Sequence, residues 1–482
     1  MVLHPLPNPA FTSAAADQSR LRRYAEYLEF YNGRQWARPR PGRTNLVLNY
    51  ARAIVDKGVS YLLGRGINFA VPAEPGDAAR ADAAEELLYQ VYQDNDLEAV
   101  DVQGAINGAV LGDTVFKVFW DQGAGDRGRE NPGAPGGRGG RGDGGRIRVV
   151  NVDPFTFFPR WAEDDPSTLL SVCLVYRLSP EEVERRYGSG EAGLASAPRA
   201  RAGDRRREAA PTIHGRSRDA DPSARPSPPA PVVVVEEWTA GELAMVAGDR
   251  ELLRTANPYG FIPFVHIPNA RPANEFWGVS DLKDLIPLNR ELNERMSDVA
   301  DAIRFHSDPP VIFKGVMEHS NLAVGPGTVW DLPEGAEVEL LEWRGQAPAV
   351  HQHIERVMRS LHDVTETPKT AFGDSGRLLS GVALETELQP LIQKTLRKRA
   401  WWTAGLRRRN SMVLRIAEIM GLGSFAPYRS RILWPALLPT DSDAEVRNNV
   451  ALVAAGLRSR RTAMDRLGEE SPEEELRRIQ EE

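Results

Sequence analysis

The residue types that usually carry chemistry are present in this chain, but few of them stand at spacings that build a catalytic site. His351 and His353 are two positions apart, which places them on different faces of a helix, whereas zinc-binding pairs on a helix are about four apart. The sequence contains no G-x-x-x-x-G-K-[ST] segment, so an ATP-hydrolysing P-loop is not predicted. No carboxylate pair or Cys/His set has a metal-binding arrangement. We therefore expect no catalytic residues, no bound cofactor and no metal site.

One segment, Gly373-Asp374-Ser375-Gly376, matches the pattern around the nucleophilic serine of chymotrypsin-like proteases. Those proteases are usually secreted, disulfide-bonded and rich in β structure, whereas this segment lies between two predicted long helices. The single cysteine, Cys173, excludes an intramolecular disulfide and fits a chain made in a reducing cytoplasm. Because Cys173 stands in an apolar, strand-like run, we expect a buried structural thiol.

The loop at residues 368–381 carries two cations that can contact phosphate, Lys369 and Arg377. Pro368 ends the preceding helix and Ser380 can cap the following one, while glycines within the loop allow its backbone to bend. Two cations suffice for transient phosphate contact and are too few for tight binding. The alternative is an ordinary surface loop with glycine turns.

Two long helices must hold this loop, and both have a regular apolar stripe. The first runs from the plausible N-cap Ser280 to Asp308-Pro309, and its apolar positions follow helical spacing: Leu282, Leu285, Leu292, Met296, Val299 and Ile303. The second repeats apolar residues at a strict four-three-four-three spacing, which suits packing against a neighbouring helix: Val350, Ile354, Val357, Leu361 and Val364. Between them, residues 311–314, 328–332 and 337–343 are short β-prone runs separated by glycine turns.

Length and composition allow a multidomain globular protein. The chain has 482 residues, of which 41% are hydrophobic, enough for real cores. Its formal net charge of -7 gives no global preference for nucleic acid, so DNA contacts must come from local patches. No signal peptide and no apolar run of about 20 residues is present, so neither secretion nor a membrane span is indicated.

The rest of the chain alternates helical and strand-like segments, which predicts an α+β, helix-rich fold. Helices are expected at 21–36, 46–63, 78–95 and 97–110, and strands at 114–120, 147–152 and 232–238. Two Arg-rich, low-complexity tracts interrupt this pattern, at 121–146 and 188–231. We interpret both as mobile inserts, with an RGG-type nucleic-acid segment as the alternative for the first.

Residues 382–420 predict one very long helix that is kinked by Pro390. This helix has a local excess of cations over Glu385, Glu387 and Glu418: Lys394, Arg397, Lys398, Arg399, Arg407, Arg408, Arg409 and Arg415. A solvated face that pairs with acidic neighbours is the first interpretation, and DNA contact is the alternative. The tail at 441–482 divides into three short predicted helices.

Four segments, in this order, resemble phage portal proteins of the SPP1-like class. They are Gly112-Asp113-Thr114-Val115-Phe116-Lys117-Val118, residues 257–269 with their Tyr-Gly-Phe-Ile-Pro-Phe core, Trp277-Gly278-Val279-Ser280-Asp281-Leu282 continuing to Asn293, and the tail 459–482. The resemblance covers nearly the whole chain. It implies a portal-type subunit with wing, long-helix stem, small β clip and helical crown.

The resemblance also implies a division of the chain: a flexible N-terminus at 1–20, the wing at 21–277, stem helix 1 at 278–306, the clip at 307–344, stem helix 2 at 345–367, the tunnel loop at 368–381, the kinked wing helix and following segment at 382–440, and the crown at 441–482. Lys369 and Arg377 are then the DNA-contacting residues of the tunnel loop. Val311, Phe313 and Trp330 are the partner-docking residues of the clip. The two Arg-rich inserts are departures from the family pattern to which the resemblance assigns no role.

As a portal protein, the chain is expected to form a homo-oligomeric ring of about a dozen subunits at one capsid vertex. Double-stranded DNA would be packaged and ejected through this ring. The implied partners are the terminase large subunit, a head-tail adaptor and capsid or scaffold proteins, without a membrane. The implied location is the virion, with assembly in the cytoplasm of the bacterial host.

Charge on the first stem helix predicts how DNA would pass. Its acids are Asp281, Asp284, Glu291, Glu294, Asp298 and Asp301, and they outnumber its bases, which are Lys283, Arg290, Arg295 and Arg304. A mildly acidic wall of this kind would repel the backbone of a sliding DNA.

Two other classes remain open at this stage. Another head-tail connector or a head-completion ring protein would also form a ring, but such proteins are usually shorter and lack paired stem helices. A DNA-processing enzyme would need clustered metal-binding carboxylates, which the sequence does not show.

Overall fold

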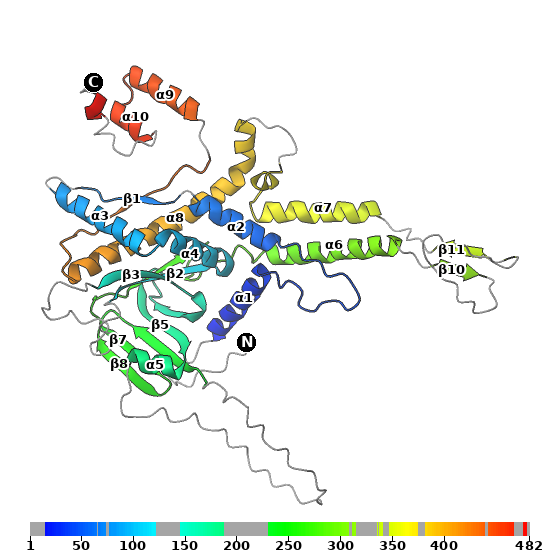
Figure 1. Cartoon of the computed structure of the whole chain (residues 1–482), viewed down its shortest axis with the longest axis horizontal. Helices are drawn as coiled ribbons and strands as arrows, with labels where there is room; N and C mark the ends of the chain where they lie inside the picture. Colours follow the sequence, from blue (N-terminus) through cyan, green and yellow to red (C-terminus); the bar gives the residue numbers. More distant parts are fainter. Residues whose placement is uncertain are drawn as a thin grey trace, which may run out of the picture.

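The computed structural model of the chain describes residues 15–64, 66–73, 77–121, 145–187, 230–307, 311–314, 335, 337–340, 347–374, 381–438, 442–466 and 476–479. Figure 1 shows a broad body of sheets and helices, a helical hairpin that projects from one side of it, and a small helical pair near the C-terminus. The α+β, helix-rich prediction is confirmed. Among the described helices, none has the length and apolar character needed to cross a membrane.

The first helix, α1 (Ala15–Tyr31), begins inside the segment that was expected to be flexible. The reason is tertiary: Arg20 is only 2% exposed and donates hydrogen bonds to the backbone carbonyls of Pro154 and Phe157. Its guanidinium also lies 4.0 Å from the ring centre of Trp277. These contacts are remote in sequence, so a local pattern does not reveal them.

Helices α2 (Tyr50–Leu63), α3 (Ala78–Asp94) and α4 (Leu97–Leu111) lie close to their predicted ranges. Helix α2 starts later than the predicted residue 46, because the side chain of Asn49 caps it by accepting a hydrogen bond from the Arg52 N–H. The residues before Asn49 are non-helical and run along another helix, as described below.

Two antiparallel sheets form the rest of the body. In the first, β2 (Asp113–Asp121) is the central strand between β3 (Arg146–Val152) and β9 (Phe264–Pro268). The second has five strands in chain order: β4 (Phe157–Trp161), β5 (Leu169–Leu178), β6 (Val232–Trp238), β7 (Glu242–Ala247) and β8 (Arg250–Ala256).

Strand pairing confirms that the first Arg-rich tract bridges two neighbouring strands. Asp121 pairs with Arg146 at the end of the β2/β3 ladder, and residues 122–144 between them lie outside the described residues. The short helices η1 (Pro154–Thr156) and α5 (Pro180–Tyr187) and the strand pair β1 (Asn68–Ala70) with β12 (Arg431–Leu433) complete the body.

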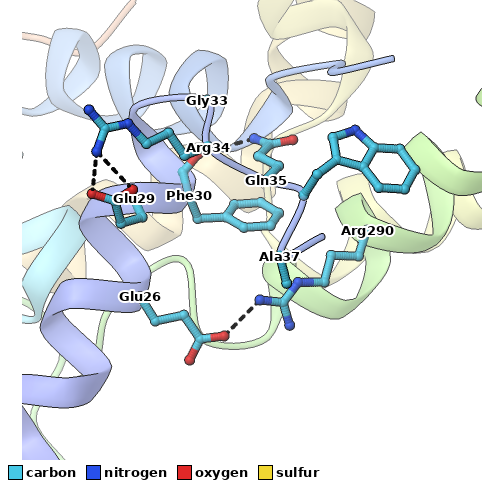
Figure 2. Close-up of a pocket in the computed structure, with 9 residues that line it drawn as sticks. Glu26, Glu29, Phe30, Gly33, Arg34, Gln35, Ala37 and Arg290 are labelled. Atoms are coloured by element: carbon cyan, nitrogen blue, oxygen red, sulfur yellow. Dashed lines mark hydrogen bonds and ion pairs between the residues drawn. The ribbon is translucent and has the colours of Figure 1, made fainter. Parts of the chain in front are cut away.

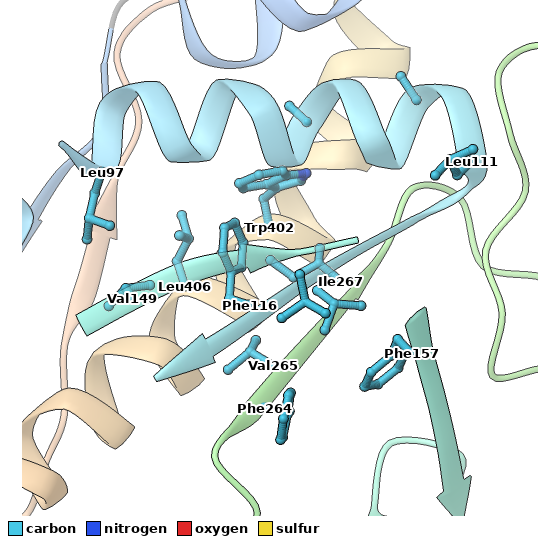
Figure 3. Packing of buried hydrophobic residues seen from close by; sticks show 14 of the residues in the cluster. Leu97, Leu111, Phe116, Val149, Phe157, Phe264, Val265, Ile267, Trp402 and Leu406 are labelled. Carbon is cyan, nitrogen blue, oxygen red and sulfur yellow. The ribbon is translucent and has the colours of Figure 1, made fainter. Parts of the chain in front are cut away.

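The hydrophobic core lies where helices α4 and α8 (Gly381–Ile419) cover the three-stranded sheet (Figure 3). The rings of Phe116 on β2 and Trp402 on α8 meet edge to face, with centres 6.1 Å apart. Gly104 of α4 allows this packing, since a Cβ there would lie 2.9 Å from the Phe116 ring. The five-stranded sheet joins the same core through Phe157, whose ring centre is 6.1 Å from that of Phe264.

The projecting hairpin consists of α6 (Leu285–Ser307), the strand pair β10 (Val311–Lys314) and β11 (Glu337–Leu340), and α7 (Ala347–Val364). The predicted β run at 311–314 is therefore confirmed, as is the part at 337–340 of the run predicted at 337–343, whose last three residues lie outside the described residues. The predicted run at 328–332 lies outside the described residues. Helix α6 starts at Leu285 rather than near Gly278, because residues 278–281 bond to the body instead of entering the helix.

After α7 the chain makes the short helix η2 (Lys369–Phe372) and then the long helix α8, which contains Pro390 as predicted. Figure 1 shows α8 bending between its first part and the part that crosses the body. The C-terminal helices α9 (Ser442–Ala454) and α10 (Arg460–Arg466) lie beyond β12, and residues 476–479 are also helical.

Candidate functional site: the root, stem and loop of the projecting hairpin

The hairpin leaves the body at a close crossing of two glycines. Gly112 has a φ of 99°, and a Cβ there would lie 2.7 Å from the carbonyl oxygen of Gly278. A Cβ on Gly278 would in turn lie 2.1 Å from the carbonyl oxygen of Gly112. Two backbones approach this closely only without side chains. The crossing explains why glycine occurs in both of these sequence segments.

A buried carboxylate, Asp113, lies beside this crossing and joins three parts of the chain. Its Oδ1 accepts from the Gly278 N–H at 2.8 Å and lies 2.7 Å from Nε2 of His266, while its Oδ2 accepts from the Tyr24 hydroxyl at 2.5 Å. Asp113 is fully buried. Burial, together with the Asp113 charge, raises the pKa of Tyr24 well above its ordinary value. Asp113 thus fixes α1 and β9 to the start of the hairpin.

A second buried acid, Asp281, anchors the hairpin to α8. Its carboxylate pairs with the ammonium groups of Lys398 and, at 3.6 Å, Lys394, and accepts from Nδ2 of Asn269 at 3.0 Å. Although burial alone would raise the pKa of Asp281, the two lysines hold it well below 3.8. Burial lowers the pKa of Lys398 to about 8, against the opposing attraction of Asp281.

The two helices of the hairpin pack through their apolar stripes, as their spacing predicted. Val357 and Leu361 of α7 and Leu292 of α6 are buried, and Ile354 and Met296 pack against them. The stripe does not extend to its predicted ends. Val364 is 51% exposed and Ile303 is 61% exposed.

The other side of α6 carries a polar ladder that sequence reasoning missed. At intervals of four residues, side-chain oxygens of α6 accept hydrogen bonds from backbone N–H groups of the extended segment at 44–48 and the start of α2. The pairs are Asn289 with Ala51 at 3.1 Å, Asn293 with Leu48, Ser297 with Leu46 and Asp301 with Thr44, each at 2.9 Å. Asn289, Asn293 and Ser297 are buried. The ladder clamps the segment before α2 against the hairpin.

Figure 2 shows the hollow beside this clamp, of about 540 Å³, between the end of α1 and α6. Its charged groups pair with one another. Arg290 donates to Glu26 at 2.8 Å, and Arg34 donates to Glu29 at 2.9 Å. The hollow therefore offers no unpaired charge to a ligand.

The structure shows which groups the acids of the predicted acidic wall contact. Asp281, whose side chain is 9% exposed, pairs with Lys398, Asp298 pairs with Arg40 at 2.7 Å, and Asp301 accepts from the Thr44 N–H. Glu291 pairs with Arg295 at 3.0 Å and lies 2.9 Å from Nε2 of His353. Asp281, Asp298 and Glu291 thus have cationic partners within the chain. The four acids inside α6, at 291, 294, 298 and 301, are three or four residues apart and lie on one face of the helix.

The loop after α7 is tied down at its start. Nδ1 of the buried His362 lies 2.7 Å from the Thr367 carbonyl oxygen, and Lys394 donates to the Thr365 carbonyl at 3.0 Å. Further along, Ala371 packs against Leu388 and Leu391 of α8. These contacts hold both ends of the turn that leads into η2.

Of the two cations predicted for DNA contact, Lys369 is exposed at the start of η2, and no ion-pair partner for it is found among the described residues. Arg377 lies in residues 375–380, outside the described residues. Ser375 of the protease-like segment lies there too. The structure therefore places one of the two loop cations at the surface beside the anchored turn.

The predicted docking residues lie at the far end of the hairpin. Val311 and Phe313 are both on β10, where Val311 is paired with Leu340 and Phe313 with Val338 of β11. Trp330 lies outside the described residues. Among the described residues, strands β10 and β11 form a two-stranded sheet, so each has one edge that the other strand does not cover.

The remaining candidates have ordinary partners. His351 lies 3.4 Å from Glu355 and His353 lies near Glu291, as expected for exposed helix histidines. Cys173 is half-buried and free, and burial raises its pKa to about 12, so it is a weak nucleophile. Among the described residues, no group of three or more potential metal ligands occurs.

Sequence reasoning missed Asp113, Asp281 and the polar ladder as site residues. Their partners come from segments far away in the chain, so spacing gave no signal for the two acids. The ladder had one readable signal: Asn289, Asn293, Ser297 and Asp301 repeat at the helical interval of four. Polar residues in such a row indicate a second buried face.

Comparison with known proteins agrees with this geometry. The family model described as phage portal protein, SPP1 Gp6-like, matches residues 12–190 and 250–482. The unmatched interval contains β6 and β7 together with the second Arg-rich tract. A search of curated proteins found no match. The family is a structural component of the phage capsid with portal and head-tail connector function. The chain therefore belongs to the phage portal protein family, SPP1 Gp6-like.

Proposed function

We propose that this chain forms the ring-shaped portal of a capsid, with the hairpin of α6 and α7 as the stem and residues 368–381 as the loop that touches DNA. The observation that carries the proposal is the anchored turn at the base of that loop. Lys394 and His362 hold the backbone at Thr365 and Thr367, while Lys369 is exposed without an ion-pair partner in the described part of the chain.

A loop with this arrangement suits a sliding polymer. Its base is rigid, because α7, η2 and α8 are bonded or packed together. Its exposed cation can attract phosphate oxygens without the many fixed contacts that would stop DNA movement. Arg377 would add a second such contact. We assign the outer strands β10 and β11, with Val311 and Phe313, to docking of the terminase large subunit and the head-tail adaptor, together with Trp330.

The test of ring formation is negative-stain microscopy and native mass measurement of the purified protein. A ring with a central hole, of about a dozen subunits, supports the portal proposal. A stable monomer at several salt concentrations contradicts it.

The test of the loop is the deletion of residues 370–377, which leaves the anchors at Thr365 and Thr367 in place. We expect rings that still enter capsids but package DNA slowly or not at all. The matched control is Asp374→Ala, a change in the same loop that removes no cation. Normal filling of heads by the deletion variant would assign the loop a connecting role only.

A further inference from the structure

Two consecutive tryptophans on α8 have opposite environments. Trp402 is 3% exposed and packs in the core against Phe116, whereas Trp401 is 36% exposed. Neighbouring residues on a helix point about 100° apart, so one faces the core when the other faces outward. An exposed tryptophan is a large apolar surface, and tryptophan and arginine are the residues most enriched at the centres of interfaces.

Trp401 lies at a groove of about 320 Å³ between α8 and the end of β9. The groove has an aromatic lining that includes Phe261 and Phe276, and arginines lie along it. The guanidinium of Arg271 is 5.8 Å from the Trp401 ring centre, and Arg408 also lines the groove. This combination suits a partner that brings carboxylates and a small apolar surface.

Of the cations of α8 near this groove, Arg408 lines it, whereas Arg407 points about 120° away from Trp401 around the helix. Arg407 and Arg408 are exposed, and neither is within ion-pair distance of a carboxylate in the described residues, although Arg408 lies near enough to Asp165 to help lower the pKa of that acid. By contrast, Arg409 is buried and pairs with Asp101 of α4. Since Arg407 precedes Arg409 by two positions, it points about 200° away from α4.

The complementary surface is on α3 of the same chain. Ala81, Ala84, Leu88 and Val91 form its buried face. Asp82 and Glu86 are exposed on the outer face, and no cation lies within ion-pair distance of either among the described residues. The exposed Ala79 and Ala83 lie beside them, and such small residues allow another helix to approach closely.

These two faces point in different directions on the chain. The outer face of α3 points away from α4 and α8, and the Arg407 face of α8 points away from α4. One subunit therefore cannot close this contact with itself. A second copy can, and a contact between two different faces of identical subunits is the type that builds rings.

We propose that the groove at Trp401, with Arg407 and Arg408, binds the outer face of α3 of the adjacent subunit. Asp82 and Glu86 of that subunit lie opposite the arginines, and its alanines lie against the indole. The inference rests on the proposed ring and names one of the contacts that close it. Opposite charges across the contact set the partner and its register.

The test is a charge swap. Arg407→Glu with Arg408→Glu should lower the ring fraction at fixed concentration by roughly tenfold or more. Adding Asp82→Arg and Glu86→Arg to the same chain should restore rings, because each contact then has opposite charges again. Rings are counted by negative-stain microscopy, and circular dichroism confirms that each variant is folded.

Two controls make the result specific. Arg160→Glu with Arg177→Glu changes the net charge equally on the five-stranded sheet, and should leave rings intact. Trp401→Ala should weaken rings without changing charge, whereas Leu422→Ala, another exposed apolar residue, should not.

Each outcome decides the matter. Normal rings in the Arg407 and Arg408 variant, equal loss in the charge control, or failure of the four-residue swap to restore rings would overturn the proposed contact. Absence of rings in the wild-type protein would instead contradict the proposed portal function. The two failures are therefore distinguishable in one assay.

Discussion

The two halves of helix α6 differ in what covers them. In the half nearest the body, Leu285, Leu292 and Ser297 are almost completely inaccessible to solvent, and apolar and polar faces alike are covered. Beyond Ser297, no residue of α6 is buried among those whose exposure the structure describes, and Ile303 is 61% exposed. One helix thus begins inside a protein core and ends on a surface.

The difference indicates which part of the hairpin folds with the body. Leu285 and Leu292 belong to the same apolar cluster as strands β2, β3 and β9, so the inner half is part of one cooperative unit. The outer half has α7 and the segment at residues 40–44 beside it, and its Ile303 is mostly exposed, so in the proposed ring an adjacent subunit would cover this side chain. Substitutions in the inner half should therefore change folding, and those in the outer half should change assembly.

The largest expected effect is at the root, with Asp281→Asn. The change removes the anion that compensates the buried Lys398 and the nearby Lys394. Breaking a buried pair by removing one partner typically costs about 3–5 kcal/mol, so the free energy of unfolding should fall by a similar amount in urea denaturation. Asp284→Asn, at an exposed position, is the matched control and should have almost no effect. Equal effects of the two would contradict the anchoring role.

Lowering the pH should reduce the difference in the free energy of unfolding between the wild-type protein and the Asp281→Asn variant. The pKa of Asp281 is below 3.8 in the folded chain, so the unfolded chain binds its proton at a higher pH than the folded chain does. The stabilisation from this carboxylate is therefore complete above pH 3.8 and is lost as the pH falls through the lower, folded pKa. When the free energy of unfolding is measured by urea denaturation from pH 6 to pH 2, the values for the wild-type protein and the variant should converge. A constant difference would mean that Asp281 stabilises the root without its charge.

A smaller effect is expected in the polar ladder, with Asn293→Ala. The change leaves the Leu48 N–H without its acceptor and removes the hydrogen bond that Asn293 Nδ2 donates to Oε1 of Gln35. An unsatisfied buried donor costs about 1–3 kcal/mol, and the loss should be local. Hydrogen exchange at the Leu48 amide measures it directly and should become faster. Glu294→Ala, the exposed neighbour, is the control. Unchanged protection of Leu48 would show that the segment at 44–48 is held by other contacts.

The sequence predicted the elements whose pattern is local. The helices α3 and α4, the strands β2 and β6, and the long helix α8 with Pro390 inside it lie within a residue or two of their expected bounds. Apolar periodicity and terminating residues suffice for these, because each buries one stripe against the core. The stripes of α6 and α7 were also correctly expected to pack together.

The parts that sequence did not predict depend on distant partners. The early start of α1 depends on Arg20 reaching Pro154, and the late starts of α2 and α6 depend on backbone bonds to other segments. The contacts of Asp298 and Asp301 are of the same kind, since Arg40 and Thr44 come from a remote segment to meet them. Spacing along the chain carries no information about such pairs.

The smallest effect on folding, and the sharpest test of the comparison, is expected for Ile303→Ala in the outer half of α6. Because Ile303 is mostly exposed in the single chain, its truncation should change the free energy of unfolding of dissociated subunits by less than about 0.5 kcal/mol. The same change should lower the concentration-dependent stability of rings, because an adjacent subunit would cover this side chain. Leu170→Ala, a similarly exposed aliphatic residue on β5, is the control and should affect neither property. Dissociation curves from native mass measurement, compared with urea denaturation of the separated subunits, distinguish the two effects. A loss of subunit stability with unchanged rings would place the outer half of α6 in the folding unit, and the contrast between the two halves would fail.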